Sequence, residues 1–386
     1  MNTKKSQVDL FKISFFSSIV ILIPFLYFFS SIPFIGKAIL LVTLGILPLL
    51  YIEPFLLWIF LFLFNPSLRI WAKNQMILER YNFNVNALIH VIILLIGTRI
   101  IWQHREKLKL IIKKYAFIKT YLLFTGLALI SIFYTVSKSV TLEHLIRLSS
   151  TLVLFLATML IIDSKDKFYK LLHVMIIGTI VPSLLGYWQS LTNTGWLDPE
   201  LRIFRINSTF LHPVTFGGYL ALTIPILYSL ITDRAKQKLK LNYILASLNN
   251  ILLIFMTLTR GIWIGLGAMF GLVGIFKNRL LLVVAFFAMI FAYTFIIPIQ
   301  ERIDDIISPR AGSSFENRLT IVRAMIPAIY DAPILGRGFG SFEQVQLDYN
   351  EEARNYSSLE AHNDYLRILV ELGVIGFILY FGSLVL

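Results

Sequence analysis

Long apolar runs recur along the 386-residue chain and constrain its fold more than any other feature. A membrane-spanning helix needs about 20 apolar residues, and in lipid each backbone polar group must be paired within the structure. Of all residues, 57% are hydrophobic and 15% charged, whereas a soluble domain has about 25% charged residues. We therefore predict an all-α, polytopic transmembrane bundle of roughly a dozen helices. The runs lie at 13–32, 35–52, 54–66, 86–102, 118–134, 147–162, 171–191, 214–231, 242–258, 261–276, 280–298 and 366–386.

Charge and cysteine content narrow the possible functions. The net charge is +13, which we attribute to basic cytoplasmic loops rather than to binding of nucleic acid. Without cysteine, the chain can form neither disulfides nor thiolate zinc sites. The basic start MNTKKSQVDLFK precedes an apolar run without a clear cleavage site, so we expect a retained first helix rather than a signal peptide. The short runs on either side of Glu53 and Pro54 form either two helices or one bent re-entrant element.

Loop charges predict the orientation of this bundle. With the N-terminus in the cytoplasm, the inner loops 103–117, 163–170, 232–240 and 277–279 carry most of the lysines. The long segment 299–363 then lies outside, with six Arg, ten acidic residues and no Lys. We therefore expect one transmembrane domain, 1–386, with both termini inside and a large extracytoplasmic loop before the last helix.

The long loop has recognisable parts. Apolar residues recur at helical spacing over about 315–330, which predicts a helix lying on the membrane surface or packed on the bundle. A turn-rich segment containing Gly336, Gly338 and Gly340 follows it. These glycines have no βαβ context, so they do not indicate a nucleotide-binding fold.

Several arginines map to the outer side, where the positive-inside rule disfavours them. A guanidinium binds phosphate through two parallel hydrogen bonds and stays charged, so converging arginines would suit a pyrophosphate. The alternative is pairing with acids of the loop itself, such as Glu316, Asp331 or Glu360. That alternative is weakest for Arg260, which has no acidic neighbour in TLTRGIWIGL and lies beside the apolar core. The outer arginines are Arg202, Arg205, Arg260, Arg318, Arg323 and Arg337.

Histidine supplies the second candidate. His362 ends the loop in LEAHNDYLRILVELGVIG, and a histidine titrating near neutrality suits a general base. The alternative is a helix start, capped by Asn363 or Asp364. Within the helix, Arg367 and Glu371 have the i,i+4 spacing of an ion pair.

A metal site is not expected. His212 precedes Pro213 and should be extended. Together with His362 it lacks a third ligand at close spacing, so we expect no metal and no cofactor.

Four stretches, in order, resemble the O-antigen ligase and O-antigen polymerase superfamily. The C-terminal one, LEAHNDYLRILVELGVIGFILYF, resembles the signature of that superfamily. TLTRGIWIGL resembles its Thr-x-Ser-Arg-Gly corner, with Thr259 in place of Ser. The resemblance covers about 200–376, and the family often has more helix after the histidine motif than this chain contains. The other two stretches are RINSTFLHPVTFGGYLAL and ENRLTIVRAMIPAIYDAPILGRGFGSF.

The resemblance implies a metal-independent, GT-C-like membrane glycosyltransferase. Its donor would be a glycan on undecaprenyl pyrophosphate, and its acceptor a sugar hydroxyl on lipid A core or on another lipid-linked glycan. It would make His362 the catalytic base and Arg260 a pyrophosphate ligand, with Arg318 and Arg337 assisting. We also expect four further residues to contact substrate: Arg202, Arg205, Asn363 and Tyr365.

Other functions remain open. The sequence does not choose between ligase, polymerase and protein glycosylation, which differ in the acceptor. A transporter or flippase for a lipid-linked glycan would also need outer arginines, but it should show inverted repeats. We see no internal repeat.

Overall fold

The computed structural model describes residues 54–73, 85–198, 203–233, 238–295, 300, 314–350, 361 and 363–386. The two apolar runs before residue 54, the expected retained first helix and His362 lie outside these residues. The described part is almost entirely helical. A two-stranded antiparallel hairpin pairs Trp196 with Arg205.

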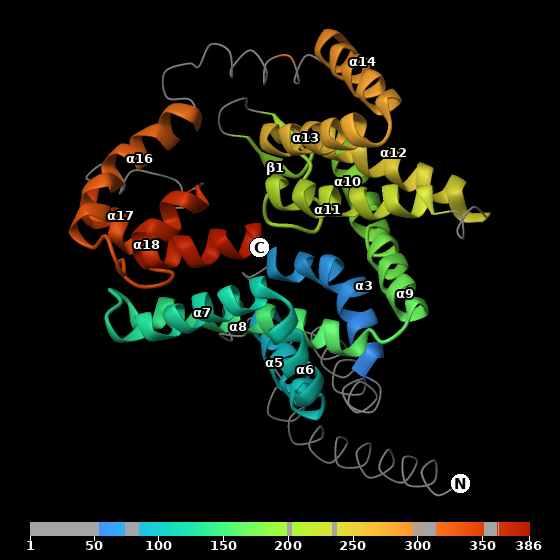
Figure 1. Cartoon of the computed structure of the whole chain (residues 1–386). Helices are drawn as coiled ribbons and strands as arrows, with labels where there is room; N and C mark the ends of the chain where they lie inside the picture. Colours follow the sequence, from blue (N-terminus) through green and yellow to red (C-terminus); the bar gives the residue numbers. More distant parts are fainter. Residues whose placement is uncertain are drawn as a thin grey trace, which may run out of the picture.

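The elements are named in chain order in Figure 1. They are α3 (Pro54–Lys73), α5 (Val85–Gln103), α6 (Arg105–Lys114), α7 (Ala116–Ile130), η2 (Ser131–Phe133), α8 (Lys138–Ile161), α9 (Lys165–Ile177), α10 (Ile180–Leu191), β1 (Trp196–Leu197), β2 (Phe204–Arg205), α11 (Pro213–Thr232), α12 (Lys240–Met256), α13 (Arg260–Phe276), α14 (Arg279–Phe295), α16 (Ser314–Asp331), α17 (Phe342–Tyr349) and α18 (Asp364–Val385).

Length and hydropathy identify the membrane helices. Among the described residues, five helical stretches are long and apolar enough to cross a bilayer, and four shorter apolar helices accompany them. Large apolar side chains face outward on these helices, for example Leu222, Ile264 and Ile378 at 70%, 66% and 62% exposure. Apolar surface of this kind is stable against lipid and not against water. The chain is therefore a helical membrane protein.

Two helices extend into segments expected to be loops. α8 begins at Lys138, nine residues before the predicted run at 147, because Thr141 and Leu145 are buried against neighbouring elements. The basic inner loop contains α6, whose Lys107 donates to the Leu160 carbonyl at 3.1 Å. Hydropathy alone does not detect such helices, since their polar residues interrupt the apolar runs.

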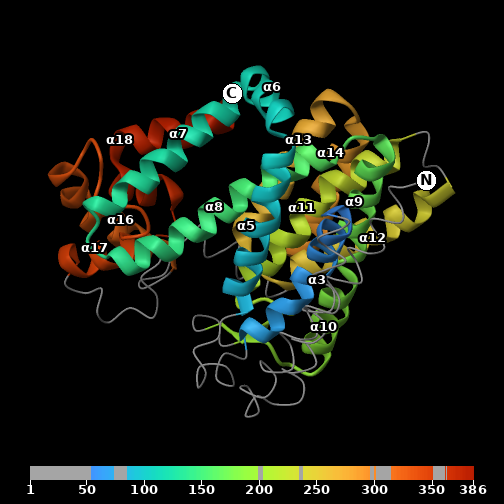
Figure 2. The same ribbon diagram turned by 90° about the horizontal axis from the view of Figure 1, so that it is seen from below.

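The helices pack in groups that Figures 1 and 2 show from two directions. α3, α5 and α8 surround the buried Trp58. α11, α12 and α13 share a core that includes Phe216 and Leu253. In the loop region, α16, α17 and α18 enclose Met325, and α18 also packs along α7.

Buried amides connect α10, α11 and α12. Asn250 is fully buried and donates to the Thr223 hydroxyl at 2.8 Å. The neighbouring Asn249 accepts from the Tyr187 hydroxyl at 2.9 Å and donates to Ser183 at 3.1 Å. Such bonds fix the relative rotation of helices in an environment where apolar packing alone is not directional.

Polar contacts between segments distant in sequence fall into two sets, one on each predicted side of the membrane. One set joins Lys107 to Leu160 and Tyr169 to Asp233, at 3.1 and 2.5 Å. Lys107, Tyr169 and Asp233 belong to loops predicted to be cytoplasmic, and Leu160 lies near the inner end of the run 147–162.

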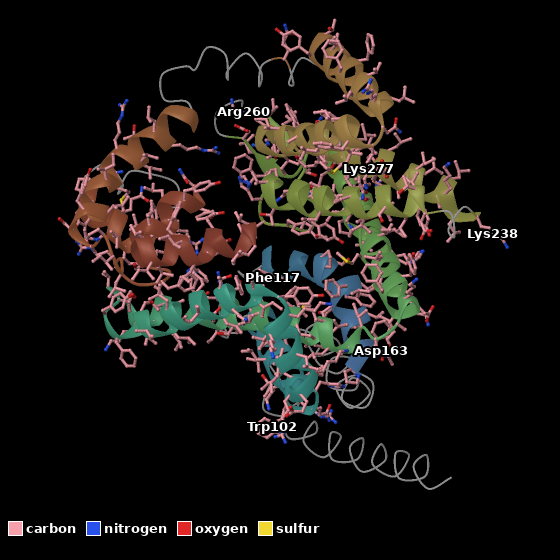
Figure 3. The ribbon with its side chains drawn as sticks, viewed as in Figure 1. Trp102, Phe117, Asp163, Lys238, Arg260 and Lys277 are labelled. Atoms are coloured by element: carbon pink, nitrogen blue, oxygen red, sulfur yellow. The ribbon has the colours of Figure 1, made fainter. Side chains whose placement is uncertain are left out.

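The other set joins residues that the predicted orientation places at the outer side, including Pro66 and Tyr134 at the ends of two apolar runs. The Thr209 hydroxyl donates to the Pro66 carbonyl at 2.6 Å, and the Tyr134 hydroxyl to the Leu335 carbonyl at 3.0 Å. Figure 3 shows Arg260 and Lys277 at opposite ends of α13. This arrangement agrees with helices that alternate in direction.

Candidate functional site

The α12–α13 corner presents Arg260. α12 ends at Met256, and Leu258 then adopts φ +50°, a left-handed conformation that is costly for a side chain other than glycine. This residue reverses the chain so that α13 begins at once, with Arg260 as its first residue. Arg260 is partly buried and makes contacts with its surroundings. The corner thus places the Arg260 guanidinium where the apolar helices α12 and α13 meet.

Arg205 holds this corner from the hairpin. Its side chain is buried, and its Nε donates to the Thr257 carbonyl at 2.8 Å while Nη2 donates to the Thr259 hydroxyl at 3.0 Å. Nη1 forms an ion pair with Asp198 at 3.0 Å, and the guanidinium lies 5.3 Å from the centre of the Trp196 ring. The hydroxyl at 259 is thus an acceptor for Arg205, which Ser would also supply. Arg205 therefore supports the Arg260 corner through bonds within the protein.

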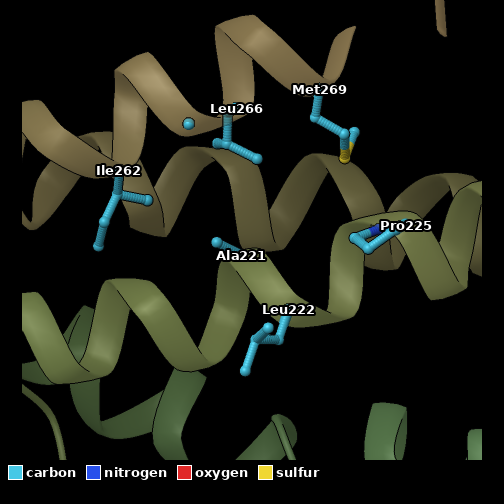
Figure 4. A pocket seen from close by; sticks show the side chains of 7 residues that line it. Ala221, Leu222, Pro225, Ile262, Leu266 and Met269 are labelled. Carbon is cyan, nitrogen blue, oxygen red and sulfur yellow. The ribbon is translucent and has the colours of Figure 1, made fainter. Parts of the chain in front are cut away.

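An apolar groove begins beside the same corner. Figure 4 shows its lining side chains on α11 and α13. Its volume is about 240 Å³. Ile262, two residues after Arg260, lines its near end, and Met269 lines the far end. No charged side chain lines it, so it suits a hydrocarbon chain. The full lining is Ala221, Leu222, Pro225, Ile262, Gly265, Leu266 and Met269.

The start of α18 forms the second part of the site. The side chain of Asn363 accepts from the backbone N–H groups of Tyr365 and Leu366, at 3.0 and 3.2 Å, which confirms the predicted cap. The helix begins at Asp364, so the residue before the cap is His362, outside the described residues. Tyr365 is exposed and stacks on Phe381 at 4.4 Å between ring centres.

Arg337 belongs to a three-residue cluster at the ends of α16 and α17. Its Nη2 donates to Asp331 at 3.1 Å and also to the Tyr349 hydroxyl. Tyr349 in turn donates to Asp331, and this hydrogen bond raises the pKa of Tyr349 above its usual value. The phenol therefore stays protonated at neutral pH and remains a donor. The pairing of Arg337 with Asp331 is the alternative that the sequence left open, and the Arg337 Nε is buried without a partner.

The remaining predicted residues are dispersed. Arg318 and Arg323 lie at exposed positions of α16, and Arg202 lies outside the described residues. His212 is extended, as predicted, and its Nδ1 accepts from the Val214 N–H at 3.2 Å, so it caps α11. Its ring also packs edge-on against Trp196 at 4.6 Å.

Asp198, Tyr349 and the packing role of Glu371 were not found from the sequence. Asp198 and Tyr349 lie in polar stretches where nothing distinguishes them from ordinary surface residues. Glu371 was recognised only as a partner of Arg367, and this i,i+4 pair is confirmed at 3.2 Å. Its contacts with the glycine-rich segment join residues about thirty positions apart, which local spacing does not reveal.

The fold and the site define an integral membrane protein in which a polar loop with arginines packs on the last helix. Residues 243–381 match the family model for O-antigen ligase, which supports the resemblance of this part of the chain to the O-antigen ligase and polymerase superfamily. The matched region contains the Arg260 corner, Arg337 and α18. A comparison with the curated proteins finds no match.

Proposed function

We propose that the chain is a metal-independent glycosyltransferase. It moves a glycan from undecaprenyl pyrophosphate to a sugar hydroxyl, on lipid A core or on another lipid-linked glycan. The reaction takes place at the outer face of the bacterial cytoplasmic membrane, with the N-terminus of the chain in the cytoplasm and about twelve spanning helices. The match of residues 243–381 to O-antigen ligase carries this proposal.

The reaction is a single displacement at the anomeric carbon. His362 takes the proton of the acceptor hydroxyl, whose oxygen forms the new bond to that carbon. The bond from the carbon to the pyrophosphate oxygen breaks, and undecaprenyl pyrophosphate leaves with the electron pair. With one displacement and no carboxylate nucleophile assigned, we expect inversion at the anomeric centre.

Arginines stabilise the leaving group. Negative charge grows on the pyrophosphate in the transition state, and fixed donors lower the barrier because they need no reorganisation at that moment. Arg260 is the main ligand in this proposal, and Arg318 and Arg337 assist. Arg205 acts as a positioning residue, since it is buried and donates hydrogen bonds to Thr257, Asp198 and Thr259.

The groove between α11 and α13 is proposed to hold the polyprenyl chain. It is lined by apolar residues and begins two residues from Arg260, so a lipid tail there would place its pyrophosphate near that guanidinium. A Cβ at Gly265 would meet no atom within 4 Å, so a larger side chain fits into the groove without backbone strain.

Filling the groove should weaken donor binding. We expect Gly265→Phe to raise the KM for the lipid-linked donor about tenfold or more, because the tail loses its apolar contacts. Gly267→Phe is the matched control, since Gly267 is on the same helix with equally open space but does not line the groove. Donor titrations with both variants measure the effect. Equal KM values would show that the tail binds elsewhere.

The function is tested with purified protein in liposomes, given a lipid-linked glycan donor and candidate acceptors. We expect transfer with release of undecaprenyl pyrophosphate, and the same rate after chelation of divalent metals, because arginines serve in place of a metal ion. Glycan on lipid A core identifies a ligase, and longer lipid-linked chains a polymerase. Donor translocation without a new glycosidic bond would indicate a flippase and reject the proposal. A loss of activity that Mg²⁺ restores would reject its metal independence.

A further inference from the structure

The last helix is broken at Gly373, and the glycine-rich segment fills the break. Gly373 has φ +62° and ψ −164°, which interrupts the helical hydrogen bonds of α18. The N–H groups of Arg337 and Gly338 donate to the carbonyls of Val370 and Glu371, at 2.9 and 2.8 Å. In the other direction, Val374 N–H donates to the Pro333 carbonyl at 2.8 Å. The loop backbone thus supplies the partners that the broken helix lacks.

Glycine is required where this segment contacts the helix. Gly336 has φ +68°, and a Cβ there would lie 2.4 Å from the backbone carbon of Glu371. Gly340 has φ +77°, and its Cβ would lie 2.7 Å from the His144 ring. The segment is therefore held between α18 and the start of α8, and its position has little tolerance.

Glu371 adds a side-chain contact to this junction. Its carboxylate is 1% exposed and accepts from Arg367 Nε at 3.2 Å. The carboxylate lies beside the backbone of Gly340 and Phe342, where α17 begins, and its Oε2 is buried without a hydrogen-bond partner.

The start of α17 has no side-chain cap of its own. The hydroxyl of Ser341, at the N-cap position, donates instead to the Gly338 carbonyl at 2.6 Å. A carboxylate near a helix N-terminus is stabilised by the helix dipole, so the buried Glu371 favours this position of the start of α17.

We propose that Glu371, paired with Arg367, is a positioning residue that keeps Arg337 in place against the first half of α18. Because Glu371 is buried, it acts on the reaction only through its neighbours, and this role rests on the proposed function. The Arg337 backbone is bonded to Val370, and Asn363 caps the same helical segment seven residues earlier, roughly 10 Å along the axis. His362 directly precedes this cap. Loss of the carboxylate would let the glycine-rich segment shift and move Arg337 away from the N-terminal half of α18.

The test compares Glu371→Gln with Glu371→Asp in the full chain reconstituted in nanodiscs. We expect Glu371→Gln to lower kcat between about 10- and 100-fold, with little change in the KM of the donor, since misplacement by about 1 Å has such effects. Amide exchange of Gly338 and Phe342 should become faster in parallel. Glu371→Asp, which keeps the charge, should recover part of both. Arg367→Gln provides a second route to the same loss if Glu371→Gln does not fold.

Asp348→Asn is the control, because Asp348 is an exposed acid on α17 away from this junction. It should leave both kcat and amide exchange unchanged. Wild-type kcat in Glu371→Gln despite faster exchange would overturn the positioning role, and so would a lower kcat with unchanged exchange. Wild-type activity in His362→Ala would instead reject the proposed function, while the exchange data still test the junction.

Discussion

Replacing His362 by alanine should reduce glycan transfer by about 10²- to 10⁴-fold, the usual contribution of a general base. The acceptor hydroxyl would then have to lose its proton to water during attack. The measurement is transfer by the reconstituted protein, together with the surface-glycan ladder in a cell lacking the native gene. Ladders should disappear while the protein remains in the membrane fraction.

The control for this variant is His104→Ala. His104 is exposed and lies between α5 and α6, in a loop predicted to be cytoplasmic. His104→Ala should leave the surface-glycan ladder unchanged. It therefore shows whether the effect of His362→Ala is specific to the proposed base or follows from removing any histidine. A normal ladder from His362→Ala would mean that another group accepts the proton.

Arg260→Ala should raise the barrier to transfer by about 3–4 kcal/mol, by analogy with the removal of one oxyanion donor. Arg260 is the first residue of α13, and Arg205 holds the preceding residue, Thr259, by a hydrogen bond to its hydroxyl. A guanidinium in such a supported position can meet the charge that develops on the pyrophosphate. Lysine at position 260 should restore only part of the rate, because an ammonium is a point charge and lacks the planar fork of a guanidinium.

Arg279→Ala is the matched control for Arg260→Ala. Arg279 is the first residue of α14 and is exposed, but it lies at the opposite end of α13 from Arg260. Comparison of kcat and KM among wild type, Arg260→Ala and Arg279→Ala separates donor binding from transition-state stabilisation. Equal kcat/KM for wild type and Arg260→Ala would remove Arg260 from the mechanism.

Local spacing predicted the parts of this fold that depend on neighbours in sequence. The apolar runs mark the membrane helices, since a span needs its apolar residues together. The Asn363 cap and the Arg367–Glu371 pair follow from positions one turn apart on a helix. The start of α8 was missed because polar residues such as Glu143 break the apolar pattern that hydropathy detects.

Contacts between distant residues explain what the sequence could not predict. Local spacing does not reveal that Arg205, which we predict to contact substrate, bonds to Asp198, Thr257 and Thr259. The junction between Arg337 and Val370 depends on the break at Gly373. A single glycine within an apolar helix does not indicate a break, because isolated glycines are tolerated in transmembrane helices. The placement of His362 near Arg260 remains a prediction.

The central claim is that His362 and Arg260 share one pocket, and the cysteine-free sequence allows a direct test. We would introduce the pair Arg260→Cys and His362→Cys, treat membranes with a short bismaleimide, and identify joined peptides by mass spectrometry. Lys277→Cys with His362→Cys is the control, because Lys277 lies beyond the far end of the 17-residue α13, about 25 Å from Arg260. We expect cross-linking of positions 260 and 362 and none of positions 277 and 362. No cross-link at the first pair, or one at the second, would contradict the claim.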